Sequence, residues 1–188
     1  MGGFSSLMAL SDVTTSRLRL SRWDPALHTG ALEAINALPE AVTYLNDGVP
    51  YTPAETAAQS ARFAAHWDQH GFGLWAATVV ATGEVIGFVG VCHPLWFPEL
   101  AQQVEVGWRL HPKAWGNGYA TEAGRAALQS AWSELALERV IAVIDPGNAP
   151  SIAVAERLGM TCEKRMPHPQ RPGSVDTYVA VPPANTSR

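Results

Sequence analysis

The sequence predicts a mixed α/β fold, and three observations lead to that prediction. Strand-like and helix-like segments follow in the order strand, two helices, three strands, helix, strand, helix, two strands. The short apolar run 139–144 is typical of a buried parallel strand. A glycine-containing loop joins a predicted strand to a predicted helix. The length of 188 residues favours one domain, which we expect over residues 14–182, with flexible termini at 1–13 and 183–188.

Local sequence marks each element of the first half. Leu18 and Leu20 alternate with arginines, as in a half-buried strand. Asp24 and the proline after it supply a helix cap and a first helical residue. Thr52 can cap a second, alanine-rich helix, which Gly71 ends. The predicted elements are a strand over 15–23, a helix from 24 to about 38, a polar connection over 39–53 and a helix over 54–70.

The second half contains six further strands and two helices. The segment 81–84 between two apolar runs is short enough for a hairpin. Gln103 to Leu110 alternates after a loop rich in proline and aromatic residues, and Gly159 ends the last helix. The predicted strands are 74–80, 85–92, 103–110, 139–144, 160–166 and 175–181, and the predicted helices are 119–135 and 149–158.

Charge and hydropathy exclude several classes of partner. The net charge of −4 and the pI near 5.8 argue against a nucleic-acid or anionic-membrane surface, because clustered Lys and Arg hold such partners. The longest apolar run, Val85 to Cys92, falls far short of the ~20 residues of a membrane-spanning helix. Residues 1–12 lack the basic start and cleavage site of a secretory signal, so we expect a cytoplasmic protein.

The loop from Trp115 to Thr121 has the composition of an anion-binding site. Gly116 and Gly118 allow the backbone to turn sharply and direct several N–H groups at one point, where the positive end of the helix dipole also acts. A P-loop would need a Lys-Ser/Thr pair, and a dinucleotide-binding loop would need a third glycine or alanine where Thr121 stands. The sequence therefore predicts a diphosphate site of another kind.

This loop resembles the pyrophosphate-binding loop of the GNAT superfamily of acetyl-CoA-dependent N-acetyltransferases, written Gln/Arg-x-x-Gly-x-Gly/Ala. Trp115 takes the first place, Gly118 the fourth and Ala120 the sixth. The wording Trp-Gly-x-Gly-Tyr-Ala-Thr-Glu-Ala is similar to the branch of ribosomal-protein N-terminal (Rim-type) acetyltransferases. The resemblance implies a twisted mixed sheet of about seven strands, splayed between the fourth and fifth, with about four helices.

The resemblance also implies where acetyl-CoA, the co-substrate, would bind. Its pantetheine arm would pair with the backbone at the end of the fourth strand, and its diphosphate would lie on the loop amides. In relatives, an Asn at the start of the next helix contacts the pantetheine arm, a place that Asn148 takes here. The implied residues are Trp108, Arg109, Leu110, Trp115, Gly116, Asn117, Gly118, Tyr119, Ala120, Thr121 and Asn148. Helix capping alone also explains Asn148.

Two side chains are candidates for proton transfer. Glu105 faces the strand split if Val104 and Val106 lie in the core, and partial burial would raise its pKa as a general base requires. The alternative is an ordinary solvent-facing strand glutamate. Ser151 falls in the first turn after Asn148, and by resemblance its hydroxyl would protonate the leaving thiolate. Many relatives use a tyrosine for that step, and no tyrosine here is obviously placed for it.

The acceptor would be a primary amine, either a protein N-terminus or a small molecule. We expect the residues Tyr44, His93, Trp96 and Phe97 to line its pocket. His66 and His70 have the spacing of zinc ligands, but Trp67 stands where His-Glu-x-x-His has its Glu, so no metal is expected. Family members are often dimers, so a homodimer is compatible with the resemblance. The alternative function is a non-catalytic acyl-CoA-binding or regulatory module.

Overall fold

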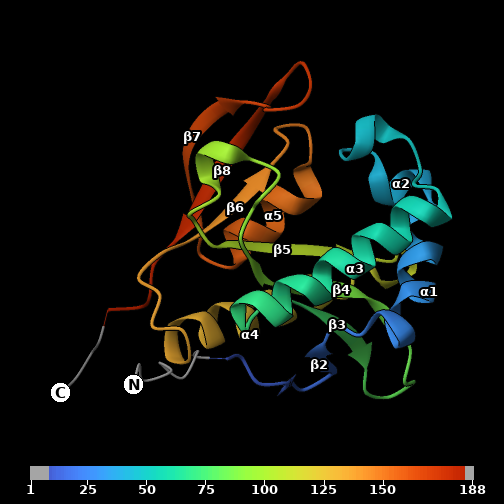
Figure 1. Ribbon diagram of the computed structural model, residues 1–188. Helices are drawn as coiled ribbons and strands as arrows, with labels where there is room; N and C mark the ends of the chain where they lie inside the picture. Colours follow the sequence, from blue (N-terminus) through green and yellow to red (C-terminus); the bar gives the residue numbers. More distant parts are fainter. Residues whose placement is uncertain (1–8, 185–188) are drawn as a thin grey trace, which may run out of the picture.

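The structure is a computed structural model that describes residues 9–184. One eight-stranded sheet runs through it in the order β1-β2-β3-β4-β5-β6-β8-β7 (Figure 1). Neighbouring strands are antiparallel except β5 and β6, which are parallel. The strands are β1 (Val13–Thr14), β2 (Leu18–Arg22), β3 (Leu74–Val79), β4 (Val85–Cys92), β5 (Glu105–Leu110), β6 (Val140–Ile144), β7 (Thr161–Pro167) and β8 (Ser174–Ala180).

Helices cover both faces of this sheet. On one face α1 packs against α3 and β4, and Figure 1 shows α3 lying across the central strands. On the other face α4 packs against β4 and β5, and α5 packs against α4 and β6. The helices are α1 (Pro25–Asn36), α2 (Pro39–Val42), α3 (Pro53–His70), α4 (Tyr119–Ser133) and α5 (Ala149–Arg157), with short 3-10 turns η1 (Asn46–Gly48), η2 (Pro98–Leu100) and η3 (Pro112–Ala114).

The predicted caps explain where two of these helices begin. The side chain of Asp24 accepts a hydrogen bond from Ala26 N–H ahead of α1. Thr52 and Glu55 form a reciprocal capping box at the start of α3, and Gly71 ends that helix in the left-handed conformation. Local chemistry therefore fixes these boundaries before any tertiary contact forms.

The fold class is confirmed, with two differences in the number of elements. The expected strand over 15–23 begins only at Leu18, and Val13–Thr14 forms a separate short strand, so the sheet has eight strands where about seven were expected. The connection over 39–53 contains the single-turn helix α2, which makes five helices where about four were expected. Neither two residues nor one turn is long enough to produce a detectable hydrophobic period.

The folded chain begins earlier than the predicted boundary at residue 14. Leu10 is buried and its N–H donates to the carbonyl of Gly71, while Ser11 N–H donates to the carboxylate of Glu134. The rest of the segment expected to be a flexible terminus, residues 1–8, lies outside the described residues, as do 185–188. Within residues 9–184 no helix combines the length and hydropathy needed to cross a membrane.

Candidate active site

The parallel strands β5 and β6 pair at one position only, Glu105 with Ile141, and separate beyond it. Ile141 N–H donates to the carbonyl of Val104, and at the other end of β5 His111 N–H donates to Ile86 on β4. Backbone groups alternate in direction along a strand, so odd-numbered residues of β5 direct theirs to β4 and even-numbered residues direct theirs to the split. The splayed sheet is thus confirmed.

Trp108, Arg109 and Leu110 were expected to offer backbone groups at the split, and the alternation shows that they do not all do so. Trp108 directs its N–H and C=O there, and so does Val106, which the sequence reasoning missed. Leu110 also faces the split, but its carbonyl accepts a hydrogen bond from Trp115 Nε1 at 2.8 Å. Arg109 pairs with Phe88 and directs its backbone to β4, so the expectation for Arg109 is wrong and its side chain is the part that reaches a cavity.

Two cavities meet at the split. The smaller one, which we call the split cavity, has a volume of about 110 Å³ and is lined from both faces of β5, by Glu105 and Gly107 and by Val106 and Trp108. The larger one, the large cleft, measures about 930 Å³ and lies beneath α3. Glu105 lines both of them. A group bound in the large cleft can therefore approach a group bound in the split next to this carboxylate.

Glu105 is the first residue of β5, and its carboxylate faces the split as expected. Val104 and Val106 are buried, and Oε1 of Glu105 accepts a hydrogen bond from Val143 N–H at 3.3 Å. Burial raises the pKa of Glu105 to about 7, against the opposing effect of that hydrogen bond. A carboxylate with this pKa can exchange a proton near neutral pH, and the alternative of an ordinary solvent-facing glutamate is wrong.

The start of α5 forms the opposite wall of the split cavity. Asn148 caps the helix, since its Oδ1 accepts a hydrogen bond from Ser151 N–H at 3.2 Å, and both residues line the cavity with Glu105. Tyr44 also lines it, with its ring against Gly147. The structure therefore brings a tyrosine to this site, which sequence order could not indicate because Tyr44 comes from the segment before α3.

The glycine loop, residues 115–121, has the conformation that its composition predicts. Gly116 and Gly118 both have positive φ, at 76° and 77°. No side chain caps α4, so the first N–H groups of the helix have no side-chain partner at the cap. Asn117 donates to the carbonyls of Ala114 and Trp115 and so shapes the turn. An added Cβ at Gly116 would meet nothing within 4 Å, so the loop is open on that side.

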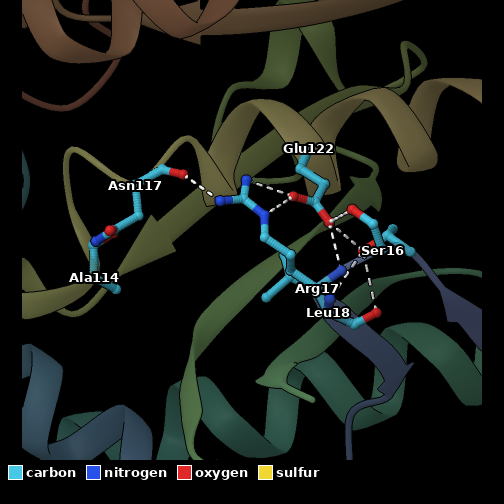
Figure 2. Close-up of polar contacts among 7 residues, drawn as sticks. Ser16, Arg17, Leu18, Ala114, Asn117 and Glu122 are labelled. Carbon is cyan, nitrogen blue, oxygen red and sulfur yellow. Dashed lines mark hydrogen bonds and ion pairs between the residues drawn. The ribbon is translucent and has the colours of Figure 1, made fainter. Parts of the chain in front are cut away.

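A polar network attaches this loop to the hairpin between β1 and β2 (Figure 2). The Glu122 carboxylate accepts from Thr15 Oγ1 at 2.6 Å, Ser16 Oγ at 3.1 Å and Arg17 N–H at 3.0 Å, and it pairs with the Arg17 guanidinium at 2.6 Å. Burial alone would raise the pKa of Glu122, but these hydrogen bonds outweigh it and lower the pKa below its usual value. A negatively charged glutamate is therefore built into the first turn of α4.

Arg17 is a site residue that the sequence reasoning missed. Its Nη1 donates to the carbonyl of Asn117 at 2.9 Å (Figure 2). Its guanidinium carbon lies 4.7 Å from the centre of the Tyr119 ring. These contacts hold a positive charge beside the glycine loop. Arg17 and Asn117 are 100 residues apart in the chain, and only the packing of the hairpin on α4 brings them together.

The expected acceptor residues separate into two groups. Tyr44, His93 and Trp96 line the large cleft, and Tyr44 and Trp96 also line the split cavity. Phe97 is 1% exposed and packs with Leu100, Ile141 and Val175 in a small core cluster. The expectation that Phe97 lines the pocket is therefore wrong. Trp96 lies in a turn and is 37% exposed, whereas the side chain of the next residue enters the core.

Hydrogen bonds occupy both ring nitrogens of His66. His93 N–H donates to Nε2 of His66 at 3.0 Å, so Nδ1 carries the proton that is shared with the carbonyl of Phe72 at 2.8 Å. Burial lowers the pKa of His66 to about 4, which keeps it neutral. Because no lone pair remains, His66 cannot bind zinc with His70. The described residues contain no group of three or more His, Cys, Asp or Glu side chains that could hold a metal ion.

Arg171 closes the cleft from the connection between β7 and β8. Its Nη2 donates to the carbonyl of Tyr44 at 3.1 Å and to Asp145 Oδ2 at 3.2 Å, and its Nη1 lies 3.6 Å from the carboxylate of Asp47. Three segments far apart in sequence are fastened together at the mouth of both cavities. Nothing in the local sequence around Arg171 distinguishes it from a surface arginine.

Comparison with known proteins decides the family. Residues 17–161 match the family described as the acetyltransferase (GNAT) domain, which is most of the chain. This chain belongs to the acetyltransferase (GNAT) domain family. A solved acetyltransferase from Agrobacterium tumefaciens has 30% sequence identity and a TM-score of 0.78, and the match covers 96% of this chain and 100% of that one. The eight-stranded sheet and the split between β5 and β6 thus belong to the GNAT fold.

Two further relatives place limits on the comparison. The Bacillus subtilis protein YkkB, itself uncharacterized, is 37% identical over 107 residues, which span 53% of this chain and 59% of YkkB. The match therefore spans less than two thirds of this curated relative. RimL, a ribosomal-protein acetyltransferase solved with coenzyme A, has a TM-score of 0.72 at 18% identity, over 90% of this chain and 96% of RimL. At that identity the likeness concerns the fold.

Proposed function

We propose that this GNAT protein transfers an acetyl group from acetyl-CoA to a primary amine by direct transfer in a ternary complex. The observation that carries the proposal is the position of Glu105, where the split cavity meets the large cleft. Acetyl-CoA enters the split, with its diphosphate on the glycine loop and its pantetheine arm along the backbone of Trp108, beyond the single pairing of β5 with β6. The acceptor enters from the large cleft.

The residues fit this co-substrate on three grounds. The glycine loop is open at Gly116 and α4 begins without a side-chain cap, and each of these features favours a diphosphate. Asn148 and the even-numbered residues of β5 face the split from opposite walls, as a narrow, hydrogen-bonding chain such as pantetheine requires.

In the proposed reaction Glu105, directly or through a water, takes a proton from the ammonium group of the acceptor. The freed nitrogen lone pair attacks the thioester carbonyl carbon, and a backbone N–H at the split stabilises the oxyanion. The C–S bond then breaks, the thiolate takes a proton from Ser151, and the amide nitrogen gives up its second proton, which restores the Ser151 hydroxyl, while Glu105 releases its proton to solvent. Tyr44 lines the same cavity and is a second candidate for protonating the thiolate. The products are an N-acetylated amine and free coenzyme A.

The resemblance of the loop to Rim-type enzymes, and the shared fold with RimL, favour a protein N-terminal amine as the acceptor. Small-molecule amines are the other class. We assign the enzyme to the cytoplasm, and we expect neither nucleic acid nor a membrane among its partners because its charge is negative. A homodimer is compatible with the proposal but plays no part in it.

The test is release of free thiol from acetyl-CoA in the presence of a panel of peptides and small amines. We expect turnover with at least one class, and Glu105→Gln should reduce kcat/KM by about 10²-fold or more while acetyl-CoA affinity is retained. A protein that binds acetyl-CoA but acetylates no amine would instead be an acyl-CoA-binding or regulatory module. Ser151→Ala and Tyr44→Phe, compared in the same assay, identify the proton donor.

A further inference from the structure

The large cleft contains a half-buried arginine that has no carboxylate partner among the described residues. Arg109 lines the cleft, and its Nη1 donates to the Asn36 side chain and, at 3.5 Å, to Gln59 Oε1. Its Nε is buried with no hydrogen-bond partner among the described residues. None of the ion pairs within residues 9–184 includes Arg109. Burying a charge without an opposite charge is costly, which is characteristic of binding sites rather than of structural cores.

The surroundings of Arg109 hold the guanidinium in place without neutralising it. Its central carbon lies 5.5 Å from the centre of the Tyr51 ring and 5.4 Å from that of Phe88. Two amide oxygens, from α1 and α3, fix one edge of the group. Nη2 makes no hydrogen bond to the described residues, and because Nε is enclosed by protein atoms, Nη2 is the nitrogen that can donate to a carboxylate in the cleft.

The charged groups in and around the cleft are unevenly distributed between its two ends. Asp47 pairs with Arg171, which also binds Asp145, and Arg62 lines the cleft without an ion pair in the described residues. Glu105 is the remaining acidic residue of the lining, at the opposite end of β5 from Arg109. An anionic group on a ligand is therefore favoured at the Arg109 end and disfavoured at the Glu105 end.

Glu105, Gly107 and Arg109 alternate along β5 and so share one face of the sheet. An added Cβ at Gly107 would meet nothing within 4 Å, so the floor between the two charged side chains is open. Four residues of strand separate them, or roughly 13 Å between Cα atoms. A ligand that reaches both would be about as long as three extended residues, roughly 10 Å.

Building on the proposed function, we propose that the acceptor is an amine that also carries a carboxylate about three residue lengths away, with the amine at Glu105 and the carboxylate on Arg109. An α-amino acid is too short, because its amine and carboxylate share one carbon. Both an acidic peptide N-terminus and a long ω-amino acid meet the requirement. Arg109 is then a specificity-determining residue, which binds the part of the acceptor that does not react.

The test compares matched acceptors with and without the charge: trialanine and its C-terminal amide, ω-aminooctanoate and its amide, and alanine and alaninamide. For the trialanine pair, the ω-aminooctanoate pair or both, kcat/KM should be roughly 30-fold higher for the carboxylate than for its amide. This ratio corresponds to about 2 kcal/mol from a buried charge pair. The alanine pair should lack this preference. The pair with the larger preference distinguishes a peptide from a small-molecule acceptor.

Arg109→Gln should remove the preference, so that each carboxylate and its amide have equal kcat/KM in this variant, and Arg109→Lys, which keeps the positive charge, should retain part of the preference. Arg19→Gln removes an exposed arginine of β2 that lines neither cavity, and it should change nothing. Equal kcat/KM for carboxylates and amides in the unaltered enzyme would overturn the inference whether or not a variant folds. So would a preference that survives in Arg109→Gln.

Calorimetric binding of the same compounds to the coenzyme A-saturated protein separates this inference from the proposed function. Tighter binding of the long carboxylates, lost in Arg109→Gln, would support the carboxylate site even if no amine were acetylated. Acetylation of amines with no preference for carboxylates, in rate or in binding, would leave the proposed function standing and overturn the carboxylate site.

Discussion

Replacing Glu105 with glutamine should make the protein more stable while it removes the proposed base. Raising the pKa of this carboxyl from its usual 4.5 to about 7 disfavours the ionised form in the folded protein by about 3 kcal/mol, at 1.36 kcal/mol for each pKa unit. The glutamine amide is neutral at every pH, and its oxygen can still accept the hydrogen bond from Val143 N–H. The variant keeps the contact without the desolvated charge.

The sign of the pH dependence follows from proton binding. Between pH 4.5 and about 7 the folded protein holds a proton on Glu105 that the unfolded chain releases, so the unfolding free energy of the unaltered protein falls as the pH rises through this range. Glu105→Gln should lack this decline. The variant should therefore be more stable by up to about 3 kcal/mol near pH 8, and the two proteins should be equal at pH values well below 4.5.

The measurement is urea unfolding of both proteins across this pH range, with kcat/KM determined in parallel. Glu99→Gln is the matched control, because Glu99 is an exposed carboxylate on the loop before β5 that makes no hydrogen bond through its side chain in the described residues. The reasoning would be refuted if Glu105→Gln were no more stable than the unaltered protein near neutral pH. A pH dependence of stability that is identical in the two proteins would refute it as well.

Three other substitutions test separate parts of the structure. Glu122→Gln should lower the unfolding free energy by about 2 kcal/mol at neutral pH and weaken coenzyme A binding. This loss of stability should vanish in acid, because the Glu122 carboxylate of the unaltered protein becomes protonated below its lowered folded-state pKa. Phe97→Ala should lower the unfolding free energy by about 3–5 kcal/mol in a thermal or urea melt, because the Phe97 ring lies in the core. A loss below about 1 kcal/mol would indicate that the ring lines the cleft instead. Gly118→Ala should cost about 1–2 kcal/mol of backbone strain and weaken coenzyme A binding. Gly83→Ala has the same strain in the turn between β3 and β4 and should leave that binding unchanged, so equal loss of binding in both would contradict the assignment of the loop.

The elements were predictable wherever their signals are local. Strand β4 and helix α3 have nearly the predicted bounds, because an alternating or continuous apolar pattern and strong caps surround them. The glycine loop was predictable for the same reason, since a left-handed backbone at Gly116 and Gly118 and a helix start after them are properties of a few adjacent residues. The two-residue strand β1 and the single turn α2 carry too little pattern to be found.

The site was predictable only in part. Glu105, Asn148 and Ser151 line one cavity, as the resemblance to GNAT enzymes led us to expect. The roles of Phe97 and Arg109 were misjudged, because a sequence does not fix which way a loop residue points or which strand a backbone group faces. Arg17 and Arg171 were missed, since their importance comes from partners about a hundred or more residues away.

The sequence by itself determined the order of the elements, the left-handed turn of the glycine loop and the membership in the GNAT family, because these depend on residues that are neighbours in the chain. Only the tertiary structure decided that Glu105 is half-buried at the meeting point of two cavities, that Tyr44 lines the same cavity, and that Arg109 has no ion-pair partner among residues 9–184. The physical reason is that burial and charge pairing depend on which segments pack together, and packing joins residues that the chain keeps far apart.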